Sequence, residues 1–189
     1  MKNRFFYICF LFTFLCWCIP FISRFFVLPK TIQLSEIETI KFEEINITNA
    51  VIDAFDNNDN KTAFVLIFKN NMKNCILNVV GGAMLGLGTF VNIIFNGFVS
   101  ADIFASCYYS GLTVEEILKT TLPHSFELIG FWLSGATGFY IAWYIILMIR
   151  GKEIKSTQFY KIVGINFLIM FLITLSAAYV EAYITPQIA

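Results

Sequence analysis

Three titratable side chains are the main candidates for chemistry in this sequence of 189 residues. His124 is the only histidine, and Glu127 follows it three positions later, so the two side chains would share one face of a helix. Glu181 lies near the end of a long apolar run and could meet them at the same depth. One imidazole and two carboxylates suffice to bind a zinc-like divalent ion and leave a position open for water.

Other uses of this candidate polar site stay open. Asn70 and Asn71 begin another apolar run and could join the same group. Such a set can form a hydrogen-bond network that locks helices together, a path for protons or a substrate, or a metal-assisted hydrolase. The His-x-x-Glu spacing does not choose among these uses, because the second histidine of the zinc-protease helix is absent. The pattern leaves enzymatic activity undecided and suggests a divalent metal as the one cofactor to consider.

Composition indicates which solvent surrounds these side chains. Hydrophobic residues make up 58% of the chain and charged residues only 14%, against roughly half and a quarter in ordinary soluble domains. A folded chain of this size leaves about 30% of its unfolded surface in contact with solvent, which for so apolar a chain favours lipid. The net charge is zero and no basic block occurs, which argues against nucleic acid as a partner. We predict an all-α membrane protein in contact with lipid.

Five apolar runs are candidates for transmembrane helices: residues 5–28, 72–95, 98–112, 126–149 and 159–183. The run 98–112 is short and could instead be a re-entrant half-helix. Basic residues flank the start of the first run and the end of the fourth: Lys2, Arg4, Arg150, Lys152 and Lys155. Basic loops stay on the cytoplasmic side of a membrane. With five crossings, the N-terminus is expected in the cytoplasm and the C-terminus outside it.

Three parts are expected along the chain. Residues 1–29 form an N-terminal membrane anchor, because no small-x-small cleavage site lies between Ile19 and Thr31, and Arg24 can snorkel to the interface. Residues 30–69 form an acidic extracytoplasmic segment with one or two short helices, or a short strand within 39–47, and a turn at 56–60. Residues 70–189 form a helical membrane domain, in which Thr113 and Glu116 begin a short interfacial helix with a capping box.

Small residues recur at helical spacing inside two of the apolar runs. Gly82 and Gly86 form a small-xxx-small pair in the second run, and Ser134, Gly138 and Ala142 repeat the spacing in the fourth. In lipid, such positions let neighbouring helix backbones approach closely. A tightly packed bundle is expected. Association with other membrane or envelope proteins, or with a second copy of the chain, stays open.

Several short motifs follow one another in one order: Phe68-Lys69-Asn70-Asn71, Gly86-Leu87-Gly88-Thr89, Asn96-Gly97, Pro123-His124-Ser125-Phe126-Glu127-Leu128 and Tyr179-Val180-Glu181-Ala182-Tyr183-Ile184-Thr185-Pro186. By this order and spacing, residues 63–186 resemble the stage II sporulation protein M family. The first 62 residues match the family only in outline. Ser125 departs from the family's pattern, in which glycine usually follows the histidine.

The resemblance implies a bacterial plasma-membrane protein that crosses the membrane several times. In spore formers the founding type is similar to a scaffold that holds peptidoglycan-degrading partners. A scaffold or partner-binding component of an envelope complex is therefore the first interpretation. Relatives also occur in gene groups for bacteriocin export, so the resemblance does not establish a role in sporulation. The alternative interpretation is a transporter component or a metal-assisted hydrolase built around His124, Glu127 and Glu181. The motif residues that the resemblance carries over are Asn71, Asn96, Gly97, His124, Glu127 and Glu181, which adds Asn96 to the candidate polar site.

Overall fold

The computed structural model describes residues 4–27, 42–121, 125–152 and 156–185, and all secondary structure in them is helical. The long helices are α1 (Arg4–Val27), α3 (Asn60–Gly81), α4 (Leu87–Tyr109), α6 (Glu127–Ile149) and α7 (Ser156–Tyr179). The short ones are α2 (Phe42–Asp56), a 3-10 helix (Gly82–Met84), α5 (Val114–Thr121) and a π-helical turn (Val180–Ile184) that continues α7. The predicted all-α class is confirmed, and the strand considered for 39–47 is not formed from Phe42 onwards.

Four stretches are long and apolar enough to cross a membrane: Arg4–Arg24, Leu87–Tyr109, Glu127–Ile149 and Ser156–Ile184. The sequence predicted five. Helix α3 is not among the four, because Lys69, Lys73 and a series of asparagines lower its hydropathy. The chain is a membrane protein with at least these four candidate spans.

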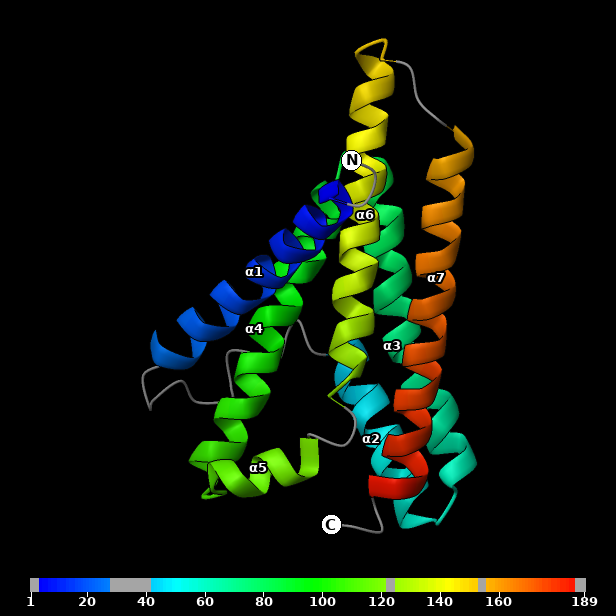
Figure 1. Ribbon diagram of the computed structural model, residues 1–189. Helices are drawn as coiled ribbons and strands as arrows, with labels where there is room; N and C mark the ends of the chain where they lie inside the picture. Colours follow the sequence, from blue (N-terminus) through cyan, green and yellow to red (C-terminus); the bar gives the residue numbers. More distant parts are fainter. Residues whose placement is uncertain (1–3, 28–41, 122–124, 153–155, 186–189) are drawn as a thin grey trace.

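The predicted second span, residues 72–95, is wrong as a single helix. Helix α3 ends at Gly81, and α4 begins at Leu87. Between them, Leu85 and Gly86 adopt the left-handed region, with φ of 54° and 85°. Glycine enters that region without steric cost, so the glycine-rich stretch ends one helix and reverses the chain. Helices α3 and α4 therefore form a helical hairpin (Figure 1).

The boundary between the predicted runs 72–95 and 98–112 is also wrong, because Asn96 and Gly97, which separate them, lie inside α4. The Asn96 side chain does not open a turn, since its Nδ2 donates to the backbone oxygen of Asn92 at 2.8 Å. A Cβ on Gly97 would lie 2.6 Å from the carbonyl oxygen of Trp17, so glycine is needed where α1 crosses α4. The run 98–112 is therefore mostly the second half of α4 and not a separate span or half-helix.

Two predictions about local turns are confirmed. Asn58, in the expected turn at 56–60, has a positive φ of 55°, and Asp59 caps α3 by accepting a hydrogen bond from the Thr62 amide at 3.0 Å. The capping box of α5 is formed in both directions: Glu116 Oε2 accepts from the Thr113 amide at 2.7 Å, and the Thr113 hydroxyl accepts from the Glu116 amide at 3.2 Å. These signals depend only on neighbouring residues, which makes them readable from sequence.

Gly82 and Gly86 lie in the turn of the hairpin and not on one face of a helix. A Cβ on Gly82 would overlap the carbonyl oxygen of Gly138 in α6. A Cβ on Gly86 would lie 3.2 Å from the Cβ of Ala142, one turn further along α6. Ser134 is fully buried one turn before Gly138. The hairpin turn therefore rests directly on the small-residue face of α6.

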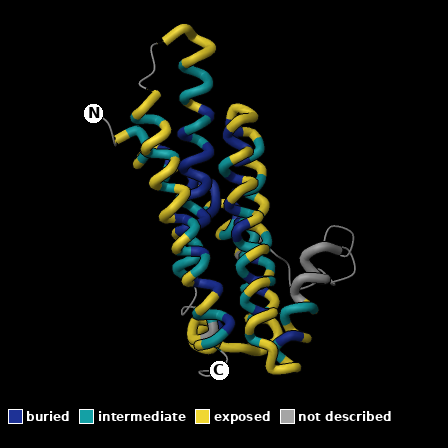
Figure 2. Tube along the Cα trace, turned by 90° about the vertical axis from the view of Figure 1, so that its right-hand side faces the viewer, coloured by how far each residue is buried: buried dark blue, intermediate teal, exposed yellow. Residues whose placement is uncertain are grey.

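The two ends of the bundle differ in the elements that they hold. The start of α1 and the end of α6 lie at one end, whereas α2, α5 and the end of α7 lie at the other (Figure 1). Exposed residues follow the outer faces of the helices, and buried ones lie between them (Figure 2). Many of the exposed side chains are large and apolar, among them Leu11, Ile19, Val91, Leu168 and Leu172. So large an exposed apolar surface fits a lipid environment.

Candidate functional site

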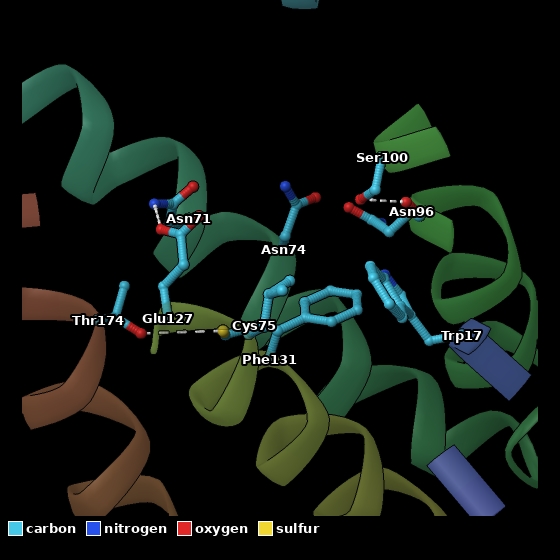
Figure 3. A pocket seen from close by; sticks show the side chains of 10 residues that line it. Trp17, Asn71, Asn74, Cys75, Asn96, Ser100, Glu127, Phe131 and Thr174 are labelled. Atoms are coloured by element: carbon cyan, nitrogen blue, oxygen red, sulfur yellow. Dashed lines mark hydrogen bonds between the residues drawn. The ribbon is translucent and has the colours of Figure 1, made fainter. Parts of the chain in front are cut away.

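A polar pocket lies where all five long helices meet. It encloses about 110 Å³, which is room for several water molecules or a small head group. Its lining side chains are Trp17 from α1, Asn71, Asn74 and Cys75 from α3, Asn96 and Ser100 from α4, Glu127, Leu128 and Phe131 from α6, and Thr174 from α7 (Figure 3). The pocket combines a carboxylate and several amides with two aromatic rings.

Glu127 is the acidic side chain that lines the pocket. It is the first residue of α6, where the positive end of the helix dipole stabilises a carboxylate. Its Oε2 accepts a hydrogen bond from Asn71 Nδ2 at 2.5 Å. Glu181 lies in the π-helical turn after α7 and interacts electrostatically with Glu127. Turns of this kind occur often beside functional sites.

Two rows of polar side chains face each other across the hairpin. Asn71, Asn74 and Asn78 are spaced three and four residues apart on α3, which places them on one helix face. Asn92 and Asn96 are four residues apart on α4, and Ser100 follows at the same interval. The rows begin at the pocket and lead toward the turn of the hairpin, so they form one polar strip through an otherwise apolar bundle.

Asn78 is the inner end of this strip and is completely buried. Its Nδ2 donates to Ser134 Oγ at 2.9 Å, and its Oδ1 accepts from Asn92 Nδ2 at 2.8 Å. Its backbone oxygen accepts from the Thr89 hydroxyl at 2.7 Å. A buried amide that is bonded on every side fixes the relative positions of α3, α4 and α6.

Some polar groups of the pocket have no partner. The Asn74 side chain makes no hydrogen bond to any described residue, although its backbone oxygen accepts from Asn92 at 3.2 Å. The indole N–H of Trp17, a residue only 8% exposed, likewise has no partner in the described part of the chain. Buried polar groups are nearly always bonded to protein or water. These two groups are therefore open to bound water or a ligand.

The structure brings together part of the predicted polar site. Asn71, Asn96 and Glu127 all line the pocket, and Glu181 acts on Glu127 from the end of α7. His124 lies outside the described residues, so its position relative to Glu127 and Glu181 stays a prediction. Among the described residues, no group of three or more histidine, cysteine, aspartate or glutamate side chains is placed to hold a metal ion. The predicted His124, Glu127 and Glu181 metal site also stays a prediction.

Sequence reasoning missed several pocket and strip residues, namely Trp17, Asn74, Cys75, Asn78, Asn92, Ser100 and Thr174. The spacing of the asparagines was the available signal. Positions 71, 74 and 78 repeat at helical intervals, as do 92, 96 and 100. In lipid, a polar stripe on a helix must face protein or water, so two such stripes on successive helices indicate a shared polar interface.

Sequence reasoning also missed an ion pair. Arg24 Nε donates to Asp102 Oδ1 at 2.8 Å and joins the end of α1 to α4. The position of Arg24 at a membrane interface stays a prediction. A charge pair within apolar helices lowers the cost of placing either charge there. Two lone charges of opposite sign in two apolar runs were the signal.

Comparison with known proteins shows the family of the chain. The profile of the family described as stage II sporulation protein M matches residues 5–186, nearly the whole chain. The chain is also similar to the uncharacterized protein MJ0793 of Methanocaldococcus jannaschii, with 33% identity over 133 residues that cover 67% of this chain and 72% of that protein. No solved structure matches the chain. The chain is thus a member of the stage II sporulation protein M family.

Proposed function

We propose that the protein is a scaffold of the cell envelope that binds partner proteins within the membrane. The observation that carries this proposal is the packing of the hairpin turn on α6 through Gly82, Gly86 and Gly138, with no side chain between the backbones. Contacts of this kind make a bundle rigid. A rigid body with a large apolar outer surface is suited to hold other membrane proteins in fixed positions. Membership of the family supports the same role.

The proposal includes a membrane topology in which α3 is a fifth crossing helix. Helix α3 packs against α4, α6 and α7. Asn71 and Asn74 line the pocket, and Ile76, Leu77 and Val80 are exposed. Arg4, at the start of α1, lies at the same end of the bundle as the end of α6. Basic residues next to transmembrane helices prefer the cytoplasmic side, so that end of the bundle would face the cytoplasm. The opposite end, with α2, α5 and the C-terminus, would then lie on the outer side of the plasma membrane.

The scaffold role is tested by enlarging one glycine. Gly82→Leu is expected to abolish complexes of the tagged protein on blue-native gels of solubilised membranes, because the leucine side chain would displace α6. Gly164→Leu is the matched control, since a Cβ there meets nothing within 4 Å. His124→Ala should keep both the fold and the complexes. Gels on which Gly82→Leu resembles the wild type would refute the proposal.

The topology has its own test. A reporter that is active only outside the cytoplasm is fused after Ala189, and a second copy is inserted after Gly151. Activity is expected from the first fusion alone. Activity from the Gly151 fusion, or none from the Ala189 fusion, would exclude this orientation and with it the crossing of α3.

A second candidate function is a membrane transport path or metal-assisted hydrolase around Glu127. The pocket favours it, because a carboxylate beside open polar groups is costly to keep inside a membrane without a use. This candidate predicts that Glu127→Gln and Glu181→Gln abolish function at normal protein levels. Stoichiometric zinc in the purified protein, lost in His124→Ala, would favour the hydrolase. Normal function of both glutamine variants would remove the candidate.

A further inference from the structure

Helix α7 lies at the outside of the bundle and leaves much of its surface uncovered (Figure 1). It packs against α6 and α3 through one side, on which Met170 and Thr174 are almost fully buried. Apolar side chains on its other sides, such as Leu168 and Leu172, are exposed. Lipid tails are as apolar as these side chains, so their exposure alone does not indicate a partner.

Asn166 is a polar side chain within this helix that lipid cannot satisfy. It follows Ser156, the first residue of the span, by ten positions, so at about 1.5 Å per residue it lies roughly 15 Å along the helix and inside the hydrocarbon core. Its side chain is half-buried and makes no hydrogen bond to any described residue. It is not among the side chains that line the polar pocket, where water could reach it. Lipid tails offer neither donors nor acceptors, so the Asn166 amide needs a protein partner.

Asn166 belongs to a row of side chains with heptad spacing. We call this row the Asn166 stripe, and its members lie four, three, four and three positions apart: Ile162, Asn166, Ile169, Ile173 and Ser176. This spacing places side chains along one edge of a helix, as in two helices that pack with a left-handed crossing. Ile162 and Ile173 partly contact α6, whereas Ile169 and Ser176 are exposed. The stripe therefore borders the α6 contact and is open on its outer side.

A second copy of the chain has the chemistry that fits the Asn166 stripe. Copies of one chain insert in the same direction, so a two-fold axis along the membrane normal places two α7 helices in parallel, with both Asn166 side chains at the same depth. An amide carries donors and an acceptor, so each Asn166 can donate to the oxygen of the other. A single asparagine within an apolar heptad row is known to fix the register and the number of paired helices.

We propose that two copies of the protein pair in the membrane through the Asn166 stripe, with the two Asn166 amides hydrogen-bonded to each other. The isoleucines of the stripe pack around this contact and keep lipid away from it. The proposal does not rest on the scaffold role, because it concerns copies of this chain and no envelope partner.

The first test measures pairing of the purified full chain in liposomes. Donor and acceptor fluorophores are attached to a tag after Ala189, and energy transfer is followed as the protein is diluted with lipid. Asn166→Leu should pair at least about tenfold more weakly than the wild type, as expected for the loss of hydrogen bonds between helices in a membrane. Asn166→Gln keeps the donors and the acceptor and should recover most of the pairing. Equal pairing by the wild type and Asn166→Leu, or none by the wild type, would overturn the proposal.

Two controls separate pairing from folding. Asn166→Leu breaks no hydrogen bond within the described chain, so its unfolding temperature in dilute detergent, where the chain is monomeric, should not fall below that of the wild type. Gly164→Leu enlarges a residue on roughly the opposite side of α7, where a Cβ meets nothing within 4 Å. It should pair like the wild type. Pairing that Gly164→Leu weakens as much as Asn166→Leu does would contradict the stripe as the interface.

A crosslinking test leaves Asn166 in place. Ile169→Cys puts a thiol on the stripe, and Leu168→Cys puts one about 100° away around the same helix. Both positions are exposed, at 41% and 58%. Oxidation in liposomes should link Ile169→Cys into dimers, beyond the background of the wild type with its five cysteines, and should link Leu168→Cys much less. Equal linkage at both positions, or none above that background, would overturn the proposal, whereas intact complexes on blue-native gels would still support the scaffold role.

Discussion

Helices α3, α4 and α6 meet in two different ways along the same hairpin. Near the turn their backbones touch, because Gly81 lies against Gly88 and Gly82 lies against Gly138. Further from the turn, amide side chains lie between the same helices and line the polar pocket. Residue size therefore sets the separation of the helices in this bundle. Glycines close one end, and asparagines with Glu127 keep space at the other.

The largest loss of stability is expected near the turn of the hairpin, where glycines of the turn and of α6 touch. In Gly138→Val, the new side chain would overlap the backbone of Asn78, which cannot move away without opening the hairpin. We expect a loss of about 3 kcal/mol of unfolding free energy or more, typical of severe overpacking. Thermal unfolding in detergent measures it, with Gly164→Val as control because that position faces open space. If Gly138→Val unfolded at the wild-type temperature, close backbone packing near the turn would not be needed for stability.

The next largest loss of stability is expected for the buried Asn78, in contrast to Asn74, whose side chain lines the pocket. Asn78→Leu removes two side-chain hydrogen bonds of a fully buried amide, to Ser134 and to Asn92, at a cost of about 2 kcal/mol. Asn74→Leu, one turn earlier on the same helix, removes no side-chain hydrogen bond and should cost clearly less. Chemical denaturation of the two variants side by side is the measurement. Equal losses would show that the strip is not held by Asn78.

A smaller effect is expected at the ion pair that attaches α1 near the open end. Arg24→Gln leaves Asp102 without its partner. Both side chains are partly exposed, at 30% and 25%, so solvent screening limits the loss to about 1 kcal/mol. The exchanged pair Arg24→Asp with Asp102→Arg should recover most of the stability lost in each single variant. Failure of the double variant to recover would show that the contact is incidental.

The smallest effect concerns pH and the cap of α5, outside the bundle. The Thr113 amide donates to Glu116 and holds the pKa of that carboxyl below its usual value. The stabilisation of α5 is therefore present above the usual glutamate pKa and is lost as the pH falls through the lowered one. Hydrogen exchange of the first α5 amides should accelerate over that acidic range, relative to the trend of other exposed amides. Glu116→Gln should remove the pH dependence, and an unchanged profile would exclude the cap as its cause.

The sequence predicts those parts of the fold that depend on composition or on residues close together in the chain. The helical class and the membrane character follow from the apolar runs, and the cap at Thr113 follows from four adjacent residues. The hairpin did not follow, because a run of glycines serves equally as a helix contact and as a turn. Only the positive φ of Leu85 and Gly86 decides between them.

The candidate site was predictable in part for a related reason. Asn71, Asn96 and Glu127 were found through short motifs, whereas Asn74 and Asn78 were not. Their role depends on contacts between residues far apart in the chain, such as Asn78 with Ser134, 56 positions away. A helix with many polar residues is typical of a water-soluble segment, and only its contacts with other helices show otherwise. That is why α3, with its lysines and asparagines, resembled part of an extracytoplasmic segment in its first half.

The ion pair between Arg24 and Asp102 has a consequence for biosynthesis. The two residues are 78 positions apart, so at a translation rate of about 5–20 residues per second Arg24 waits about 4–16 s for its partner to be made. During that interval α1 is already emerging from the ribosome with an unpaired cation at its far end. Synthesis of α4 then supplies the carboxylate that pairs with this charge.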